Sequence, residues 1–295
     1  MIYCIQGPTA SGKTSLAIAL AMQLNTEIIS ADSRQFYREM AIGTAKPNSD
    51  ELASVQHHFV NHRSVANPMN VADFQAEGMK VLHDLLARKS NAVVVGGSGQ
   101  FVDSLVEGLD QVPVFPEIRS VLEDRLRNEG LSSLKSELVE KDPVGATQLD
   151  LNNPRRVLRA LEVLLGAGEP LWKFHRTNSG QLASVKRLAI AWKREDLYER
   201  INQRVDLMIQ QGLEAEVRHL LPFIDSPPLT TVGYKEWFPY FEGKQDFSSV
   251  VEKIKQHSRN YAKRQITWMN RYENVIWLNP YDSITIDNQV RQHLI

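Results

Sequence analysis

One stretch near the N-terminus decides the fold: Gly7-Pro8-Thr9-Ala10-Ser11-Gly12-Lys13-Thr14. It matches the phosphate-loop pattern G-x-x-x-x-G-K-[ST] at every fixed position. The glycines let backbone N–H groups wrap an anion, and a helix starting after the loop adds its dipole. We therefore expect a phosphate-bearing ligand, with Lys13 on the outer phosphate and Thr14 holding Mg²⁺.

The sequence around this loop predicts strands that alternate with helices. Strands are expected at residues 2–5, 27–30 and 92–95, and helices at 13–24 and 71–88. The run Val93-Val94-Val95 is typical of a strand buried on both faces, as in a parallel sheet. Residues 38–70 are expected to be mostly irregular. This alternation predicts an α/β core with a parallel sheet.

Residues 117–176 differ, because they carry helical patterns and no strand pattern. Helices are expected at 118–127, 131–140 and 155–165; then a strand at 187–192, helices at 195–221 and 247–270, and a last strand at 275–278. We therefore predict a core made of residues 1–116 and 185–295. Residues 117–184 form a predicted helical insertion domain.

Composition excludes several classes of protein. The 295 residues carry 34 Lys and Arg against 35 Asp and Glu, a balance unlike that of a histone-like nucleic-acid binder. The single cysteine, Cys4, excludes a disulfide framework and a Cys-rich zinc site. No apolar stretch approaches the ~20 residues of a membrane span, and no secretory signal is visible. We expect a cytoplasmic protein with no membrane contact.

The loop alone leaves the ligand open. No Asn-Lys-x-Asp segment supports a GTPase, and the strand at 92–95 ends in Gly96-Gly97 where a Walker B strand would end in an acid. The strand at 27–30 is followed instead by Asp32. An acid at that sheet edge lies beside the expected phosphate site.

Further motifs follow the loop along almost the whole chain. They are Ser30-Ala31-Asp32-Ser33-Arg34-Gln35, Gly43-Thr44-Ala45-Lys46-Pro47, His57-His58, Val71-Ala72-Asp73-Phe74, Val95-Gly96-Gly97-Ser98-Gly99, Asn153-Pro154-Arg155-Arg156, Val232-Gly233-Tyr234 and Lys263-Arg264-Gln265-Ile266-Thr267-Trp268. This ordered set resembles the tRNA dimethylallyltransferases, in the bacterial form that has no Cys/His zinc module. Two departures are Ser98, where that family usually has Thr, and Gln100-Phe101, where it has Leu-Tyr.

The resemblance implies a P-loop NTPase-like fold used for alkyl transfer. The donor would be dimethylallyl diphosphate, and the acceptor the N6 amine of the adenosine directly 3′ of the anticodon, with pyrophosphate released. It assigns Asp32 to accept the amine proton, Ser98 to hold the reacting groups and Arg204 to bind pyrophosphate. Mg²⁺ is the expected cofactor, and we expect a monomer.

These roles have structural alternatives. Asp32 could cap the next segment or hold Mg²⁺, and Arg204 could be a surface cation paired with Glu199 or Asp206. His57 and His58 point opposite ways on an extended strand, so a structural role is favoured over a metal site. Cys4 is expected in the core, and core or interface positions are expected for Trp172, Trp192, Trp237 and Trp277.

Two basic clusters indicate a nucleic-acid surface. Residues 253–272 contain six cations and no acid, namely Lys253, Lys255, Arg259, Lys263, Arg264 and Arg271. Arg155, Arg156 and Arg159 form the second cluster, with Arg119 upstream. The resemblance assigns tRNA contact, through the anticodon stem-loop, to Asp32, Ser33, Arg34, Gln35, Ser98, Arg119, Arg155, Arg156, Arg159, Thr230, Thr231, Val232, Gly233, Tyr234, Lys235, Lys263, Arg264, Gln265 and Trp268.

Other functions remain open at this point. The phosphate loop and the helical insert are compatible with an ATP-dependent small-molecule kinase. The missing Walker B acid and the basic C-terminal helix argue against it. Prenylation of free AMP would use the same first half of the chain. A non-catalytic RNA-binding ATPase switch would not need Asp32.

Overall fold

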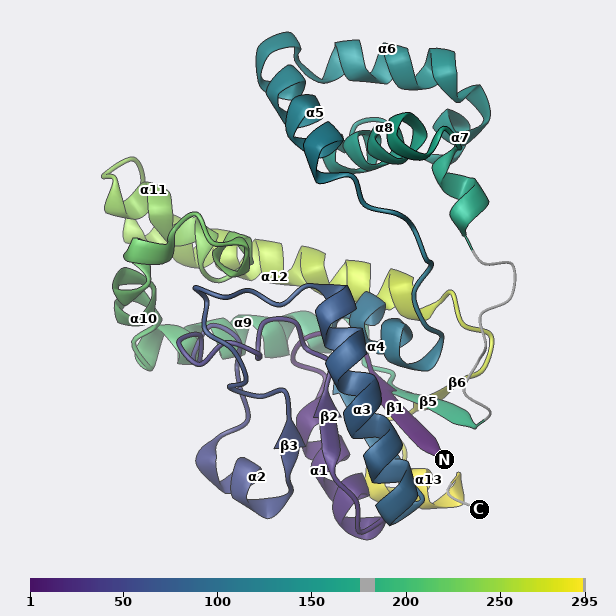
Figure 1. Ribbon diagram of the computed structural model, residues 1–295. Coiled ribbons are helices and arrows are strands. Elements are labelled where there is room, and N and C mark those ends of the chain that lie inside the picture. The colour runs from purple at the N-terminus through teal and green to yellow at the C-terminus, as the bar shows by residue number, and fades with distance from the viewer. Residues whose placement is uncertain (176–183, 294–295) are drawn as a thin grey trace. The chain divides into compact units, whose positions relative to one another are not determined.

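The computed structural model describes residues 1–175 and 184–293 (Figure 1). The chain divides into two compact units, one of Met1–Glu107 with Gln181–Ile295 and one of Gly108–Gly180. The insertion domain predicted from sequence starts later, at 117. Residues 108–115 carry no helical pattern, but hydrogen bonds connect them to the rest of the second unit: Arg159 Nη2 donates to Val112 O at 3.2 Å, and Phe115 N to Glu162 Oε1 at 3.0 Å. Residues 176–183 of that prediction lie outside the described part.

The first unit is built on a parallel sheet in the order β3-β2-β4-β1-β5-β6. Its strands are β1 (Ile2–Gln6), β2 (Ile28–Ser30), β3 (His57–His58), β4 (Ala92–Gly96), β5 (Val185–Ile190) and β6 (Val275–Leu278). In the central strand Ile2 pairs with Ala92 on one side and Val185 on the other. The predicted α/β class is confirmed. Since all strands run the same way, β1, β2 and β4 deliver their following loops to one edge.

Both faces of this sheet are covered by helices. Successive strand residues point to opposite faces. Accordingly Cys4, Ile29 and Val94 pack against residues of α3 (Val71–Lys89) and α4 (Gly99–Val106), whereas Ile28 and Val93 pack against α1 (Lys13–Gln23). Burial on both faces explains why these strands read as unbroken apolar runs.

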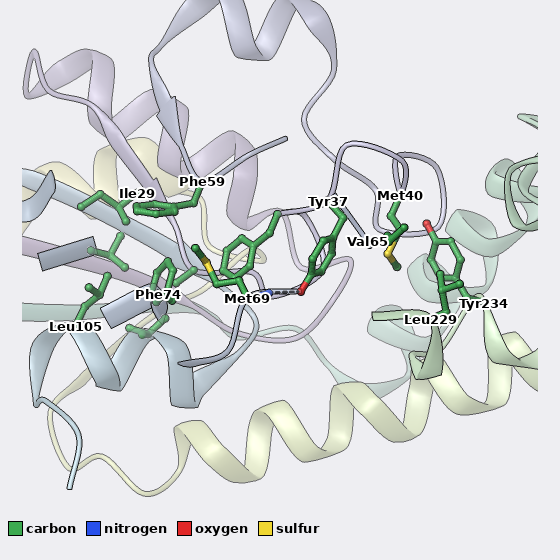
Figure 2. Close-up of a cluster of buried hydrophobic side chains, with 14 of the residues drawn as sticks. Ile29, Tyr37, Met40, Phe59, Val65, Met69, Phe74, Leu105, Leu229 and Tyr234 are labelled. Atoms are coloured by element: carbon green, nitrogen blue, oxygen red, sulfur yellow. Dashed lines mark hydrogen bonds between the residues drawn. The ribbon is translucent and has the colours of Figure 1, made fainter. Parts of the chain in front are cut away.

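An aromatic cluster anchors the segment between β2 and α3. The rings of Phe36 and Phe74 lie 5.3 Å apart, and Phe59 packs edge-on against Phe74. Figure 2 shows Phe59 and Phe74 in this cluster, and the hydrogen bond from Met69 N to the Tyr37 hydroxyl. Each such buried side chain contributes about 1.5–3 kcal/mol by removal from water. This packing orders a segment that the sequence predicted to be mostly irregular.

The remaining helices of the first unit are mostly short. They are α2 (Ser49–Ser54), α9 (Arg194–Gln210), α10 (Leu213–His219), α11 (Phe238–Phe241), α12 (Phe247–Met269) and α13 (Ile286–Gln292), with 3-10 turns at Leu221–Phe223, Pro227–Thr230 and Lys235–Trp237. The single helix predicted over 195–221 is wrong, because Gly212 at φ +94° separates α9 from α10. Glycine adopts this left-handed conformation without the steric cost that other residues meet.

The second unit is helical in its described part. It contains α5 (Pro116–Glu129), α6 (Leu131–Lys141), α7 (Pro143–Gln148), α8 (Pro154–Ala167) and a 3-10 turn at Leu171–Phe174. Leu122, Leu134, Leu138 and Leu161 are buried at its centre. The three helices predicted here are confirmed, and α7 is an addition that Asp142 caps through Gly145 N.

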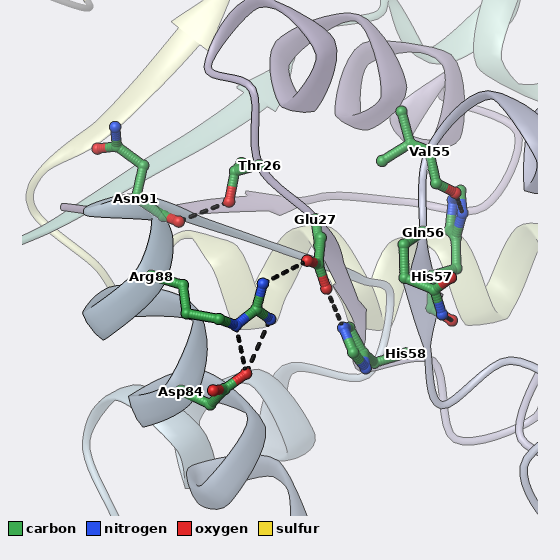
Figure 3. A network of polar contacts seen from close by, with 9 residues as sticks. All are labelled: Thr26, Glu27, Val55, Gln56, His57, His58, Asp84, Arg88 and Asn91. Atoms are coloured by element: carbon green, nitrogen blue, oxygen red, sulfur yellow. Dashed lines mark hydrogen bonds and ion pairs between the residues drawn. The ribbon is translucent and has the colours of Figure 1, made fainter.

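Polar contacts fasten β3 to the sheet. Glu27 accepts hydrogen bonds from Arg88 Nη1 at 3.0 Å and lies 2.7 Å from His58 Nε2 (Figure 3). His57 Nδ1 lies 2.8 Å from Val55 O. Each histidine is thus engaged by the protein itself, on opposite sides of a short strand.

Cys4 and Trp237 are fully buried, as predicted. Trp277 lies on the edge strand β6 and is 42% exposed, so a core position is wrong for it. No described helix is both long and apolar enough to cross a membrane.

Candidate active site

The phosphate loop connects β1 to α1, as its motif predicts. Other segments hold its backbone in shape: Gln265 Oε1 accepts from Thr9 N at 2.8 Å, Arg200 Nε donates to Ala10 O at 2.9 Å, and Trp192 Nε1 donates to Ser11 O at 2.9 Å. Ala10 sits at φ +63°, a left-handed conformation that these contacts help to maintain. The loop is therefore fixed before any ligand arrives.

A cavity of about 380 Å³ opens beside this loop, entirely within the first unit. Its walls come from the phosphate loop, the segment after β2, the end of β4, α9, the turn at 231–233 and α12. This volume suits a small ligand with a phosphate end and an apolar end. Ile201, Val205 and Met208 supply apolar surface on the α9 side.

Five charged side chains line the cavity, namely Lys13, Asp32, Arg34, Arg200 and Arg204. Three of them, Lys13, Asp32 and Arg204, lie close enough to interact electrostatically. Burial lowers the pKa of Lys13 to about 8, and the nearby Asp32 carboxylate opposes that shift. Burial likewise lowers the pKa of Arg204, again opposed by Asp32. Two cations near one carboxylate leave the site with an excess of positive charge, which favours a polyanionic ligand.

Arg204 is held at one end only. Its Nη2 lies 3.5 Å from Thr44 O, while its buried Nε has no hydrogen-bond partner among the described residues. An unpaired buried donor is costly, so it indicates a missing acceptor such as a phosphate oxygen. The predicted alternative, a surface pair with Glu199 or Asp206, is not what the structure contains: Glu199 accepts from Gln203, and Asp206 pairs with Lys255.

Asp32 also shapes its own turn. Its Oδ1 accepts a hydrogen bond from Arg34 N at 3.1 Å. The capping alternative thus has structural support, but the same side chain lines the cavity. One carboxylate can serve both purposes, because it has two oxygens and several lone pairs.

Ser98 lies beside the cavity, at the start of α4, and is not one of its lining residues. Its hydroxyl is 3.0 Å from Ser33 Oγ, and Ser98 lies near Tyr261. Burial, followed by the charge of Asp32, raises the pKa of Tyr261 to about 12. Tyr261 therefore keeps its proton at neutral pH and lies near the carboxylate.

Tyr261 was missed by sequence reasoning as a lining residue. It belongs to a stripe on α12 with Ile254, Ser258 and Gln265, spaced four, three and four residues apart, and all four line the cavity. This helical spacing was a usable signal. Arg200 was missed too, although it lies one turn before Arg204 on α9.

The expected tRNA contacts of the first unit fall into three groups, and the smallest, Ser33, Ser98 and Trp268, is half-buried and does not line the cavity. Lining or buried positions are Asp32, Arg34, Gln35, Thr231, Val232, Gly233, Tyr234 and Gln265; exposed positions are Thr230, Lys235, Lys263 and Arg264. Both Gln265 groups are occupied, since its Nε2 donates to Gly97 O at 2.9 Å. Trp268 Nε1 donates to Asp103 at 3.0 Å, and its ring packs over Gly99.

Not all cations of the basic helix α12 are free to meet phosphates. Lys255 pairs with Asp206 at 2.8 Å, Arg259 donates to Asn202 at 2.6 Å and Lys253 to Gln245 at 2.6 Å. Lys263, Arg264 and Arg271 are exposed. The last two lie over the rings of Tyr261 and Trp268.

In the second unit, Arg119 and Arg155 line one shallow cavity with Asn153 and Pro154, at the N-terminus of α8. Arg155 and Arg156 are exposed. Arg159 has an internal role, because it donates to Glu162 at 2.6 Å and to Val112 O. The two clusters seen in the sequence thus mix surface cations with cations that hold the fold.

The described residues do not form a site that could hold a metal ion by protein side chains alone. Within residues 1–175 and 184–293, no group of three or more His, Cys, Asp or Glu side chains could hold a metal ion. Thr14 and Asp32 do line the same cavity. Such sparse oxygen ligation is typical of Mg²⁺ that is bound together with substrate phosphates.

Comparison with known proteins gives consistent relatives. A family model described as IPP transferase matches residues 35–272. The tRNA dimethylallyltransferase of Christiangramia forsetii is 44% identical over 276 residues, covering 92% of this chain and 91% of that protein. That of Flavobacterium psychrophilum is 41% identical over 286 residues, covering 94% and 93%.

Solved structures agree. A tRNA isopentenylpyrophosphate transferase from Bacillus halodurans is similar with a TM-score of 0.73 and 32% identity, covering 99% of this chain and 94% of that one. A eukaryotic dimethylallyltransferase acting on tRNA is similar with a TM-score of 0.84 and 25% identity, covering 99% and 77%.

Proposed function

Because the chain belongs to the IPP transferase family and is a tRNA prenyltransferase, we propose that its prenyl donor is dimethylallyl diphosphate. The acceptor is the N6 amine of the adenosine directly 3′ of the anticodon. The observation that carries this proposal is the single cavity lined by the phosphate loop, Asp32 and Arg204. A kinase is not favoured, since no relative described above is one.

The donor diphosphate binds at the phosphate loop. The loop at residues 7–14 surrounds it with backbone N–H groups. Pro8 has no N–H, that of Thr9 is bound to Gln265, and that of Ser11 donates to Pro8 O at 3.4 Å, so the other residues of the loop supply the donors. Lys13 and the unpaired Nε of Arg204 neutralise its charge. Thr14 would hold Mg²⁺, which when bound offsets the charge that develops on the leaving diphosphate.

The acceptor amine is a weak nucleophile, so loss of its proton must accompany attack. As the N6–C1 bond forms, the C1–O bond to the diphosphate breaks, the amine proton passes to Asp32, and pyrophosphate leaves. The neutral Tyr261 hydroxyl lies near Asp32 and orients the reacting groups. Ser98 contributes from outside the cavity lining, where its hydroxyl contacts Ser33 Oγ. An adenine inside the anticodon loop must be extruded to reach this cavity.

Exposed cations provide the tRNA surface. In the first unit these are Lys235, Lys263 and Arg264, and in the second Arg155 and Arg156. The half-buried Arg119 lies with Arg155 in the shallow cavity and pairs with Glu123. The exposed cations track phosphates, while the buried members of the expected set hold the site in shape. A cytoplasmic location and a monomeric state remain predictions.

The decisive experiment incubates the protein with Mg²⁺, labelled dimethylallyl diphosphate and one of two acceptors, an anticodon stem-loop RNA or AMP. We expect label in the RNA, and N6-substituted adenosine after nuclease digestion. A stem-loop carrying guanosine at the target position is the control and stays unlabelled. Label in AMP alone would point to the free-nucleotide reaction, and phosphate transfer from ATP would point to a kinase.

A further inference from the structure

One carboxylate outside the cavity holds a wall of the cavity. Glu216, on α10, accepts hydrogen bonds from three consecutive backbone N–H groups, those of Ala41, Ile42 and Gly43, at 2.9, 2.8 and 3.1 Å. Glu216 is not a lining residue, whereas Gly43 is. Charge-assisted bonds to backbone N–H groups are stronger than neutral ones, so this is a firm anchor for an irregular segment.

The same carboxylate fastens a second wall. The Tyr234 hydroxyl donates to Glu216 Oε1 at 2.6 Å, next to the lining turn 231–233. A Cβ on Gly43 would come within 2.5 Å of the Tyr234 ring, so only glycine permits this approach. Figure 2 shows Tyr234 beside Met40, where the anchored segment begins. Glu216 therefore joins two segments that are far apart in sequence.

The anchored segment ends at the proposed diphosphate-binding arginine. Thr44 O is the acceptor for Arg204 Nη2, at 3.5 Å, and also for Gln35 Nε2, at 3.3 Å. Thr44 follows directly on the three N–H groups that Glu216 binds. A shift of this segment would move the only acceptor that the Arg204 guanidinium has among the described residues.

We propose that Glu216 is a positioning residue for the transfer reaction, acting through the segment 41–44 to aim Arg204 at the donor diphosphate. The proposal rests on the function proposed above. Glu216 touches neither substrate, and its effect is to fix the geometry in which Arg204 leaves its Nε free for a phosphate oxygen.

The test compares Glu216→Gln, Glu216→Asp and the control Glu214→Gln in the full-length protein. Glutamine replaces one of the two acceptor oxygens with an NH2 group, so some of the N–H and O–H groups that bind Glu216 lose their acceptor. Aspartate keeps the negative charge. The control residue Glu214 forms a surface ion pair with Arg218 on the same helix. We expect Glu216→Gln to weaken Mg²⁺-pyrophosphate binding, measured by calorimetry, and raise the donor KM by about 10–100-fold. Anticodon stem-loop affinity should stay within a few-fold, Glu216→Asp should recover part of the loss, and Glu214→Gln should match the wild type.

A double-mutant cycle with Arg204→Gln separates positioning from stability. If Glu216 acts through Arg204, Glu216→Gln adds little to the loss in the Arg204→Gln background. A purely structural role would instead reduce the active fraction, lowering kcat with pyrophosphate affinity and donor KM unchanged, and would overturn the proposal. So would full additivity of the two substitutions. A wild type that transfers no prenyl group would refute the proposed function, whereas an active wild type with an unaffected Glu216→Gln would refute only the role of Glu216.

Discussion

Charged side chains occur in two settings in the first unit, the enclosed cavity and the outer face of α12. In the cavity, burial lowers the pKa of Lys13 and of Arg204, and the nearby Asp32 carboxylate opposes both shifts. On α12, Lys263 and Arg264 are exposed. Charges interact strongly where water is excluded and are screened where it is not.

This contrast predicts which substitutions should change catalysis or binding most. A charged side chain inside the cavity tolerates few substitutions, because both its charge and its shape contribute to the site. An exposed cation contributes a small, salt-dependent share of a summed attraction. We therefore expect the largest effect for the carboxylate of Asp32 in the cavity, and the smallest for Lys46, whose contribution to stability changes only at high pH.

The largest effect is expected for Asp32→Asn. Asparagine keeps an oxygen for Arg34 N, so the turn survives, but it cannot take the amine proton. The single-turnover rate should fall by about 10²–10⁴-fold, with donor and tRNA affinities within a few-fold of wild type. Excess Mg²⁺ should not restore it. A near-normal rate would mean that Asp32 only stabilises its turn. Recovery of the rate at high Mg²⁺ would mean that Asp32 is a metal ligand.

Lys13→Ala comes next. It removes a buried cation from the donor site, and hydrogen bonds to charged groups contribute about 1.5–3 kcal/mol. We therefore expect pyrophosphate affinity and turnover to fall by ~10–100-fold, while filter binding of tRNA barely changes. An equal loss of tRNA affinity in a correctly folded variant would show that the cavity and the tRNA surface are not separate.

The outer face of α12 is tested by a matched pair, Lys263→Ala and Lys255→Ala. Lys263 is exposed, whereas Lys255 is already paired with Asp206. Lys263→Ala should reduce the slope of log K against log salt by about one unit, and Lys255→Ala by much less. If tRNA affinity of the wild type did not depend on salt, α12 would not track phosphates.

The smallest effect concerns Lys46, whose amine is enclosed by Tyr37 O and Asn61 Oδ1. Burial lowers its pKa to about 8, below its usual value of 10.5. Between these values the unfolded chain binds more protons, so the contribution of Lys46 to stability rises with pH from about 8. The difference in unfolding free energy between wild type and Lys46→Met should therefore grow in favour of wild type over this range. A flat or falling difference would contradict the enclosed position.

Much of the site was predictable because local sequence dictates local backbone. The phosphate loop needs its glycines within eight consecutive positions, and Asp32 follows a strand whose apolar run is visible in the sequence. Arg204 was assigned only through the family resemblance. Its unpaired Nε is a property of the folded chain, because it depends on which oxygens happen to surround it.

Other features needed contacts between distant segments. No local pattern reveals that Glu216 anchors 41–43, that Gln265 holds Thr9, or that Lys255 is neutralised by Asp206. The sequence contains Gly212, but it does not show that a helix ends there, since an isolated glycine is tolerated within helices. Ser98 likewise matched a motif, yet only the fold shows that it lies outside the cavity lining and contacts Ser33.

The sequence by itself determined the α/β core, the phosphate loop and the family, since apolar periodicity and short motifs act over a few residues. The tertiary structure decided which charges are enclosed and which face water. That division depends on long-range packing, because a side chain's burial and partners are set by segments far away in the chain. In α12 the outcome is one helix whose inner face lines the cavity and whose outer face offers cations to solvent.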